Sequence, residues 1–470
     1  MKVLLINPPS ALEVIGNIPS IVEEERGYNP PLGILYIAAY METQGRHSVE
    51  VIDAQVEELT SEHLKERVRQ SSPDVVGITA MTFSILDVLE TIRVVKAVVP
   101  ESKIVIGGPH AHLFPIETLN LPGVDFVVMG EGEYVFSELV DHIDQPEKLR
   151  TIHGLAFSYQ GQIINTGRTA MIEDLDSIPF PARHLVPYQK YSSVIAKRTP
   201  ITTMFTSRGC PFQCAFCDRP HLGKRFRAHS PKYVVDEMEA CTHLGIYEFL
   251  IYDDTFTVDK QRVMGICEEI QRRKLNIGWD VRARVDTVTP EMLKAMRAAG
   301  CERIHYGVEA GTEKILKVLN KRITVEQVRQ AFQWTKKVGM GTLAYFMIGA
   351  PTETREDILQ TIQLSKDLDP DYVHISILTP YPGTRIYFDA LEQGVFKTDF
   401  WQEFATNPTT DFEPRYWEEE LTTAELVELS NYAYKSFYLR PRYALKQLLQ
   451  VRSVGEFGRK ARAALKVVGL

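Results

Sequence analysis

Three cysteines stand close together in the middle of the chain, in the order C-x3-C-x2-C: Cys210, Cys214 and Cys217. Cysteine thiolates bind both zinc and iron–sulfur clusters. A [4Fe–4S] cluster usually takes four cysteines, so three would leave one iron open to another ligand. A zinc site would instead need a fourth protein ligand, for which His221 and His229 are available. The spacing therefore predicts a metal centre and leaves its metal open.

The triplet directly follows the first of six predicted strands. These strands are Ile201–Thr206, Tyr247–Tyr252, Ile277–Ala283, Arg303–Val308, Thr342–Ile348 and Tyr372–Leu378. Helical patterns separate them, which predicts six β/α units and an open, partial barrel. Catalytic residues of β/α barrels lie at the carboxyl ends of the strands, so this position favours an iron–sulfur cluster over zinc. The three dispersed cysteines are expected to be buried packing residues: Cys241, Cys267 and Cys301.

The first 145 residues predict a second sheet. Apolar strand patterns alternate there with helical patterns at Val3–Asn7, Val49–Asp53, Asp74–Thr79, Lys103–Ile106 and Val124–Met129. This alternation is typical of a doubly wound parallel α/β sheet, whose ligands bind at the carboxyl ends of the strands.

We expect four regions: residues 1–145, a Pro-rich linker over 146–200, the partial barrel over 201–390 and a helical region over 391–470. The 470 residues are 44% hydrophobic and 24% charged, which is ordinary for a globular protein and excludes a mainly disordered chain. The net charge of −8 argues against nonspecific nucleic-acid binding. The first apolar run is too short for a signal peptide, and no apolar stretch approaches the ~20 residues of a membrane span, so we expect a cytoplasmic protein.

The triplet after the first barrel strand, with an aromatic residue before its third cysteine, resembles the signature of radical S-adenosylmethionine (SAM) enzymes. Segments at the later strand ends resemble further motifs of that family in the same order. The resemblance implies that the open iron holds SAM, whose reductive cleavage gives a 5′-deoxyadenosyl radical. It implies SAM contacts at Phe216, Asp253, Asp254, Arg284, Glu309, Ile348 and Gly349. Carboxylates suit the SAM amino group and ribose diol, and an arginine suits the SAM carboxylate.

Before such a barrel, the first domain resembles the flavodoxin-like, Rossmann-like cobalamin domain of B12-binding radical SAM enzymes. The resemblance implies cobalamin contacts at Asn7, Pro8, Pro9, Thr79, Thr82, Gly107, Gly108, Glu131 and Gly132. The D-x-H-x-x-G motif that supplies a cobalt-ligating His in other cobalamin proteins is missing after Asp53. Most B12-binding radical SAM enzymes lack it too, so cobalamin is still expected. A domain that only shapes the substrate site is the alternative, and His110 and His112 are expected to be loop residues.

The resemblance implies methylation of an unactivated carbon in a small or lipid-like substrate, with electrons from a flavodoxin or ferredoxin. The alternative is oxidation or cyclisation, because the layout is similar to the anaerobic magnesium-protoporphyrin IX monomethyl ester cyclase. A non-catalytic sensor is a third, weaker interpretation. Four tyrosines near strand ends could supply a proton or hydrogen atom, and none is assigned: Tyr252, Tyr306, Tyr345 and Tyr381.

The end of the chain differs in charge from the rest. Residues 435–470 hold nine basic residues and one acidic residue, a net +8 within a total of −8, so the remainder carries −16. A basic helix with apolar residues can lie on an anionic membrane surface. The tail therefore predicts either peripheral membrane contact or packing on the acidic remainder of the chain.

Overall fold

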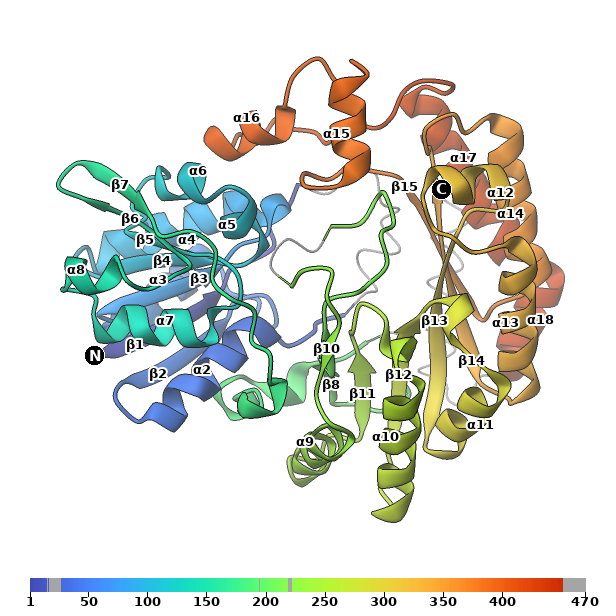
Figure 1. Cartoon of the computed structure of the whole chain (residues 1–470), viewed down its shortest axis with the longest axis horizontal. Helices are drawn as coiled ribbons and strands as arrows, with labels where there is room; N and C mark the ends of the chain where they lie inside the picture. The colour runs from blue at the N-terminus through green and yellow to red at the C-terminus, as the bar shows by residue number, and fades with distance from the viewer. Residues whose placement is uncertain (15, 17–26, 194, 219–221, 451–470) are drawn as a thin grey trace.

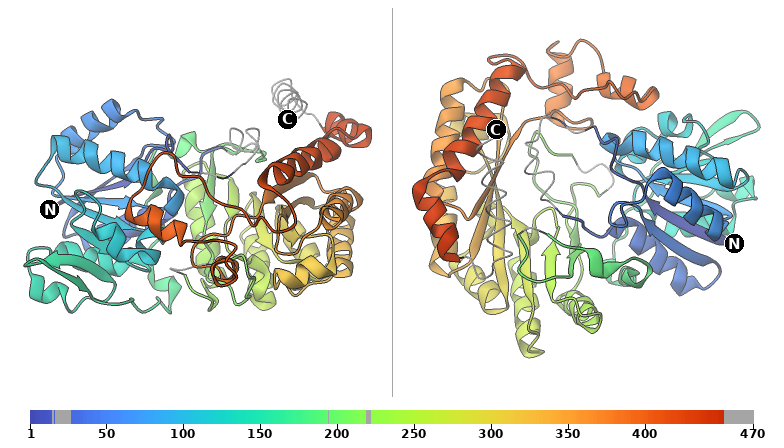
Figure 2. Two further views of the ribbon diagram at one scale, coloured as in Figure 1. Left: turned by 90° about the horizontal axis from the view of Figure 1, so that it is seen from above. Right: turned by 180° about the vertical axis from the view of Figure 1, so that it is seen from behind.

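The computed structural model describes residues 1–14, 16, 27–193, 195–218 and 222–450. Two α/β units lie side by side, each built around its own sheet (Figure 1). The first unit contains the N-terminus, and the second curves away from it as an open half-barrel (Figure 2).

The first sheet has seven strands in the order β2-β1-β3-β4-β5-β6-β7. Its strands are β1 (Lys2–Asn7), β2 (Ser48–Asp53), β3 (Val75–Thr79), β4 (Lys103–Gly107), β5 (Phe126–Val128), β6 (Leu155–Tyr159) and β7 (Gln162–Asn165). The first five are parallel, and their order 2-1-3-4-5 is that of the flavodoxin-like fold. This confirms the predicted doubly wound sheet.

Helices cover both faces of this sheet. Apolar residues of α2 (Leu32–Gln44) and α7 (Gly132–Asp141) pack on one face, and those of α3 (Ser61–Ser71) and α4 (Ile85–Val98) pack on the other. Three short helices, α5 (Pro109–Leu113), α6 (Pro115–Leu119) and α8 (Pro146–Leu149), fill the connections. The carboxyl ends of the strands are thereby left facing the second unit.

The segment predicted as a linker differs from the expectation. Its strands β6 and β7 pair antiparallel with β5 and with each other, so the first sheet extends beyond residue 145. A two-residue turn joins them, with positive φ at Gln160 (52°) and Gly161 (75°). That geometry matches the twist of a hairpin. The composition of this segment predicts a linker, but its first part forms the edge of the first sheet. Only the stretch after β7 crosses between the units.

The second sheet has six parallel strands in the order β15-β14-β13-β12-β11-β8. They are β8 (Ile201–Met204), β11 (Glu248–Ile251), β12 (Gly278–Ala283), β13 (Cys301–Glu309), β14 (Gly341–Ile348) and β15 (Tyr372–Ile377). The helices of this unit are α9 (Pro231–His243), α10 (Lys260–Arg272), α11 (Pro290–Ala298), α12 (Glu313–Val318), α13 (Val325–Lys337) and α14 (Arg355–Leu368). All six predicted β/α units are present, and the curled sheet is an open partial barrel as expected (Figure 1).

The C-terminal region consists of α15 (Arg385–Glu392), α16 (Phe400–Thr406), α17 (Thr423–Tyr438) and α18 (Pro441–Gln450). Helix α16 returns to the first unit, where Gln402 donates a hydrogen bond to Glu117 of α6. The start of the basic tail packs on the barrel, because the Tyr443 hydroxyl donates to the Asp371 carbonyl (2.9 Å). Residues 451–470 lie outside the described part. Among the described residues, no helix is long and apolar enough to cross a membrane.

Candidate functional site

The cysteine loop is carried by a small antiparallel ladder at the end of the first barrel strand. Strand β9 (Ser207–Arg208) enters the loop and β10 (Arg227–Ala228) leaves it, with Arg208 opposite Arg227. Gly209 between β9 and Cys210 has φ +75°, and a Cβ there would lie 2.3 Å from the Arg225 carbonyl oxygen. Only glycine fits this approach, so the turn into the cysteines depends on it.

The loop is packed against two other barrel connections. The Ala215 amide donates to the Leu319 carbonyl (2.9 Å), and the Ala215 carbonyl accepts from the Ile386 amide (3.0 Å). The Cys210 sulfur lies 3.5 Å from the Thr255 hydroxyl oxygen, and the Cys214 sulfur lies 3.6 Å from Nη1 of Arg284. The thiols of Cys210 and Cys214 thus lie beside the segments that follow barrel strands β11 and β12.

Zinc is not supported by this geometry. The His229 ring stacks on Tyr233 (centroids 4.0 Å apart) and contacts Asp176 (3.2 Å), and burial together with the Arg208 charge lowers its pKa to about 3. His221 lies outside the described residues. In the part of the chain that the structure describes, no three Cys, His, Asp or Glu side chains gather closely enough to hold one metal ion. A zinc ion binds its ligands at about 2–2.3 Å around one point, whereas an iron–sulfur cluster spreads its thiolates over separate irons.

The two aspartates after β11 have different surroundings. Asp253 is fully buried, and its carboxylate accepts four hydrogen bonds of 2.6–3.0 Å from the amides and hydroxyls of Thr206 and Ser207. Asp253 therefore holds the chain that leads into the cysteine loop. The sequence instead predicts that Asp253 contacts SAM. Asp254 is exposed at the same strand end. Of this pair, Asp254 is the carboxylate that the structure leaves facing solvent.

Arg284 lies directly beside the cysteine loop. Its guanidinium pairs with Asp286 through two bonds of 2.9 Å and lies 3.9 Å from the centre of the Phe212 ring. A third bond of 2.7 Å goes to the Lys321 carbonyl. The side chain is therefore held rigidly at the loop, with Nη1 directed at the Cys214 sulfur.

Glu309 at the end of β13 is buried and paired with Lys321 (2.5 Å). Its backbone has φ +73°, beyond an irregularity in the ladder between β13 and β14. A Cβ on Gly307 would lie 2.4 Å from the Glu309 carboxylate and 2.8 Å from the Lys321 nitrogen, so glycine leaves the room for this ion pair. Lys321 also lies 5.8 Å from the centre of the Phe216 ring, which brings this predicted residue to the same corner.

The turn after β14 carries Ile348 and Gly349. The Gly349 and Ala350 amides both donate to one carboxylate oxygen of Glu353, at 2.6 and 2.9 Å. Glu353 is buried, and burial raises its pKa to about 7. The turn thus presents backbone at the strand end and is held by a carboxyl group that has no basic partner among the described residues within hydrogen-bond distance.

A cavity of about 170 Å³ lies at the carboxyl ends of the first sheet. Five of the predicted cobalamin contacts line it: Thr79, Gly107, Gly108, Glu131 and Gly132. Apolar side chains of α2 and α7 complete the wall, together with Phe205, Arg208 and Leu222 from the second unit. Gly108 has φ +100°, and a Cβ there would lie 2.8 Å from the Ala80 carbonyl oxygen. Glycines therefore let the backbone form this wall.

The other predicted cobalamin contacts do not line the cavity. Asn7 donates to Asp53 (2.8 Å), and Tyr191 donates to the same carboxylate (2.7 Å). Thr82 contacts the buried His110 ring (3.2 Å), whose pKa is lowered to about 4 by burial. Asn7 and Thr82 are thus bonded to other protein groups, and Pro8 and Pro9, which follow β1, are likewise not part of the cavity wall.

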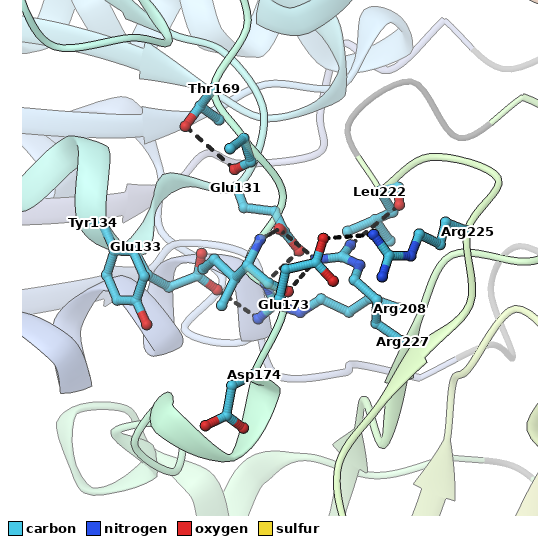
Figure 3. Close-up of polar contacts among 12 residues, drawn as sticks. Glu131, Glu133, Tyr134, Thr169, Glu173, Asp174, Arg208, Leu222, Arg225 and Arg227 are labelled. Atoms are coloured by element: carbon cyan, nitrogen blue, oxygen red, sulfur yellow. Dashed lines mark hydrogen bonds and ion pairs between the residues drawn. The ribbon is translucent and has the colours of Figure 1, made fainter.

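Four charged residues join the cavity to the cysteine loop (Figure 3). Arg208 of β9 contacts Glu131 (2.9 Å) and Glu133 (2.5 Å), which stand at the start of α7. Arg227 of β10 contacts the second oxygen of Glu131 (2.7 Å). Burial alone would raise the pKa of Glu131, but the hydrogen bond from Arg227 and the charge of Arg208 lower it. Sequence patterns do not reveal this cluster, because its paired acids and arginines lie 75 to 96 residues apart in the chain.

The four tyrosines separate by position. Tyr306 faces the helices and bonds to Thr335 (2.8 Å), and Tyr381 stacks on Trp401. Tyr252 and Tyr345 instead share the Arg282 guanidinium, which lies 4.0 Å from the centre of the Tyr252 ring.

The dispersed cysteines are buried packing residues, as expected: Cys241, Cys267 and Cys301. Burial raises the pKa of each thiol, to about 11 for Cys241 and about 12 for Cys267. None of them joins the loop site.

Two family models match the chain. The radical SAM superfamily model matches residues 204–365, and the B12-binding domain model matches residues 20–140. An uncharacterized methyltransferase of Pyrococcus horikoshii is 36% identical over 456 residues, covering 96% of this chain and 95% of the relative. The anaerobic magnesium-protoporphyrin IX monomethyl ester cyclase of Rubrivivax gelatinosus is 31% identical over 396 residues, covering 82% of this chain and 69% of the cyclase.

Solved structures share the arrangement of both units. The cobalamin-dependent SAM radical enzyme OxsB, solved with aqua-cobalamin and SAM, superposes with a TM-score of 0.75 at 17% identity, covering 99% of this chain and 72% of that one. The radical SAM methyltransferase TsrM from Kitasatospora setae, solved with cobalamin and a [4Fe–4S] cluster, gives a TM-score of 0.67 at 20% identity, covering 83% and 75%. These likenesses support the fold.

Proposed function

The chain belongs to the radical SAM superfamily, in the class that carries a B12-binding domain, and on that premise we propose that it is a cobalamin-dependent methyltransferase acting on an unactivated carbon of a small or lipid-like substrate. One observation carries the proposal: the glycine-lined cavity of the first unit and the cysteine loop of the second share Arg208, which lines the cavity and stands two residues before Cys210. A reaction that uses two cofactors needs their sites at one interface.

Each site fits its group. The three thiols of Cys210, Cys214 and Cys217 suit a [4Fe–4S] cluster with one open iron. The cavity, with a wall made of backbone and apolar side chains, suits the nucleotide tail of cobalamin at the carboxyl ends of a parallel sheet. When bound, the cluster and SAM supply an organic radical and cobalamin supplies a methyl group.

The residues around the loop have separate proposed roles. Asp254 accepts from the SAM amino group, and Glu309 accepts from the ribose hydroxyls while Lys321 balances its charge. Arg284, fixed by Asp286, presents a positive edge to the carboxylate of SAM and to the thiolate of Cys214. The turn at Ile348 and Gly349 offers backbone to the adenine. Asp253 positions the loop and makes no contact with SAM.

The substrate is proposed to enter the barrel above Arg282. Tyr252 and Tyr345 both contact this guanidinium, and each carries a hydroxyl group that can give up a proton or a hydrogen atom. Of the four tyrosines, these two are therefore the donors that we propose to test.

The decisive experiment is anaerobic reconstitution with iron, sulfide, cobalamin, SAM and a reductant. A methyltransferase converts one SAM to S-adenosylhomocysteine and another to 5′-deoxyadenosine, so both products are expected, together with a methylated substrate. Absence of 5′-deoxyadenosine under reduction contradicts the radical reaction. Absence of corrin absorbance on the purified, reconstituted protein contradicts the cobalamin role. A flavodoxin or ferredoxin is the proposed electron donor and can replace the chemical reductant in the same assay.

Oxidative cyclisation is the second candidate, because a cyclase at 31% identity matches over most of both chains. It predicts 5′-deoxyadenosine with no S-adenosylhomocysteine. The same product analysis therefore separates the two reactions.

Membrane contact through the basic tail is a further part of the proposal. Deleting residues 451–470 is expected to abolish binding to vesicles of anionic phospholipid and to leave binding to neutral vesicles unchanged. No binding of the full chain to anionic vesicles contradicts it.

A further inference from the structure

We infer that Arg208 is a positioning residue that sets the cysteine loop against the cofactor cavity, so that occupancy of one site is felt at the other. The inference rests on the proposed function for the identity of the two cofactors. The contacts that carry it lie entirely in this chain.

A single guanidinium spans the two units. Its Nη1 donates to Glu131 at 2.9 Å and its Nη2 donates to Glu133 at 2.5 Å, and both acids line the cavity. Its backbone forms β9, and Gly209 alone separates it from Cys210. A displacement of the start of α7 therefore reaches the first cysteine through one side chain and two peptide units.

The charges of the cluster cancel, which argues for positioning and against ligand binding. Arg208 and Arg227 supply two positive charges, and Glu131 and Glu133 supply two negative ones. All four residues are at most 6% exposed. The Glu131 oxygens are further satisfied by the Ile172 amide (2.7 Å), and Arg227 also donates to the Ile172 carbonyl (2.6 Å). No net charge is left over to hold a phosphate or another anion.

Arginine is required by this geometry. The planar fork reaches two carboxylates at once and lies 5.3 Å from the centre of the Tyr36 ring, on the cavity wall. A lysine is a single point charge that cannot hold both acids in fixed directions.

The same view contains a natural control (Figure 3). Arg225 pairs with Glu173 at 2.6 Å and joins the two segments that Arg227 and Ile172 also join, but its side chain and that of Glu173 are 68% and 60% exposed. Exposed pairs contribute little, because water screens them. Removing Arg225 thus changes one charge and one ion pair at the same junction without touching the buried cluster.

The experiment compares the wild type with R208K, the charge-neutral double variant R208Q/E133Q, and R225Q. The double variant removes one positive and one negative charge together and leaves the Glu131–Arg227 pair, so it is designed to fold. Thermal unfolding and iron content check each protein. The main measurement is the cobalamin dissociation constant, from corrin absorbance, for each protein with and without its cluster.

Coupled sites change each other's affinity by roughly 5-fold or more. We expect the cobalamin dissociation constants of the cluster-loaded and cluster-free wild type to differ by such a ratio, and those of R225Q to differ by the same ratio. The ratio should be smaller in R208K. It should be near 1 in R208Q/E133Q with its iron content intact. A ratio near 1 in the wild type, or a wild-type ratio in the double variant, overturns the inference.

A second measurement does not depend on cobalamin. The rate at which an iron chelator removes the cluster reports how firmly the loop is held. We expect removal to be about tenfold faster in R208Q/E133Q than in R225Q, and equal rates overturn the inference. If the wild type binds no cobalamin, the proposed function fails, while the chelator rates still decide the role of Arg208.

Discussion

The two halves of the site are built by opposite means. The cavity of the first unit is walled mostly by glycines and apolar side chains, and the charged residues of its wall, Glu131, Glu133 and Arg208, pair with one another, so it selects a ligand mainly by shape. The cysteine loop is surrounded by charged groups, and its buried charges are already paired, as in Arg284 with Asp286 and Lys321 with Glu309. A wall that selects by shape loses its ligand when an atom is added to it. A buried charged side chain destabilises the protein when its partner is removed.

This difference suits the two ligands that we propose. A nucleotide tail brings its own surface and needs room, and backbone at glycine provides room without side chains that must reorder. SAM carries an ammonium and a carboxylate group and then reacts. Charged side chains that are already held in place by ion pairs need not reorganise when it binds. The comparison predicts that a substitution in one half leaves the other half able to bind its own cofactor, with only the coupling through Arg208 affected.

The largest effect is expected for C217A. Loss of one of three cluster ligands should abolish the cluster and SAM cleavage, while the cobalamin affinity of the variant should equal that of the cluster-free wild type. Iron content, 5′-deoxyadenosine yield and corrin titration measure this, and C241A is the control for loss of a buried thiol outside the loop. Full SAM cleavage by C217A, or loss of cobalamin binding along with the cluster, breaks the comparison.

The next effect is expected for K321M, which leaves the buried Glu309 carboxylate without its partner. Removing one member of a buried pair costs about 3–5 kcal/mol of unfolding free energy. The double variant K321M/E309Q should recover most of this loss. Urea unfolding measures both, and K260M is the control, since Lys260 and Glu291 are exposed and should change stability by less than about 1 kcal/mol. Equal effects of K321M and K260M contradict preset pairing at the loop.

Glu353 is the exception in the second unit, because it is buried and no basic side chain in the described part of the chain lies within hydrogen-bond distance of it. Its carboxyl group binds a proton up to about pH 7 in the folded state but only to about pH 4.5 when unfolded. The folded state therefore holds more protons between these values, so stability falls as pH rises from about 4.5 to about 7. The difference of 2.5 pKa units corresponds to about 3 kcal/mol.

The variant E353Q tests this sign. Its neutral amide can still accept from the Gly349 and Ala350 amides, so the variant should be more stable than the wild type at pH 8, by up to about 3 kcal/mol, and should match it near pH 4.5. Urea unfolding at the two pH values gives the difference. A wild type that gains stability over E353Q as pH rises refutes the assignment.

The smallest effect is expected for G108A. The alanine backbone would have to keep φ at +100°, which costs about 1–3 kcal/mol. Its methyl carbon would also lie 2.8 Å from the Ala80 carbonyl oxygen. We expect at least a tenfold loss of cobalamin affinity with normal cluster content. G245A is the control, because Gly245 also has a positive φ (79°), nothing lies within 4 Å of a Cβ there, and it does not line the cavity. Normal cobalamin binding by G108A means that the cavity wall tolerates added atoms.

Local patterns were sufficient for the fold. The parallel strands of both sheets were predictable because each carries apolar residues in a run or in alternation, between segments with helical periodicity. The two pieces that form β6 and β7 have strand-like patterns, but their pairing with β5 was not predictable, because β7 is largely exposed and both strands run antiparallel at the edge of a parallel sheet.

The site was predictable where a motif carries chemistry in itself, as the cysteine triplet does. It was not predictable where a residue's role depends on a distant partner. Asp253 and Arg284 both follow a barrel strand. The carboxylate of Asp253 accepts hydrogen bonds from Thr206 and Ser207, whereas the guanidinium of Arg284 contacts Cys214 of the cysteine loop. Glu131 was expected to touch cobalamin, and its carboxylate instead bonds Arg208 and Arg227, far away in sequence.

The separation between Arg208 and its partners also has a meaning in time. Arg208 lies 77 residues after Glu131 and 75 after Glu133. At about 5–20 residues per second, the ribosome adds Arg208 roughly 4–15 s after the two acids. All seven strands of the first sheet have been synthesised by residue 165. The first unit can thus fold while Glu131 and Glu133 are still hydrated. The cysteine loop is synthesised later and can pair with these two acids before the remaining strands of the barrel are made.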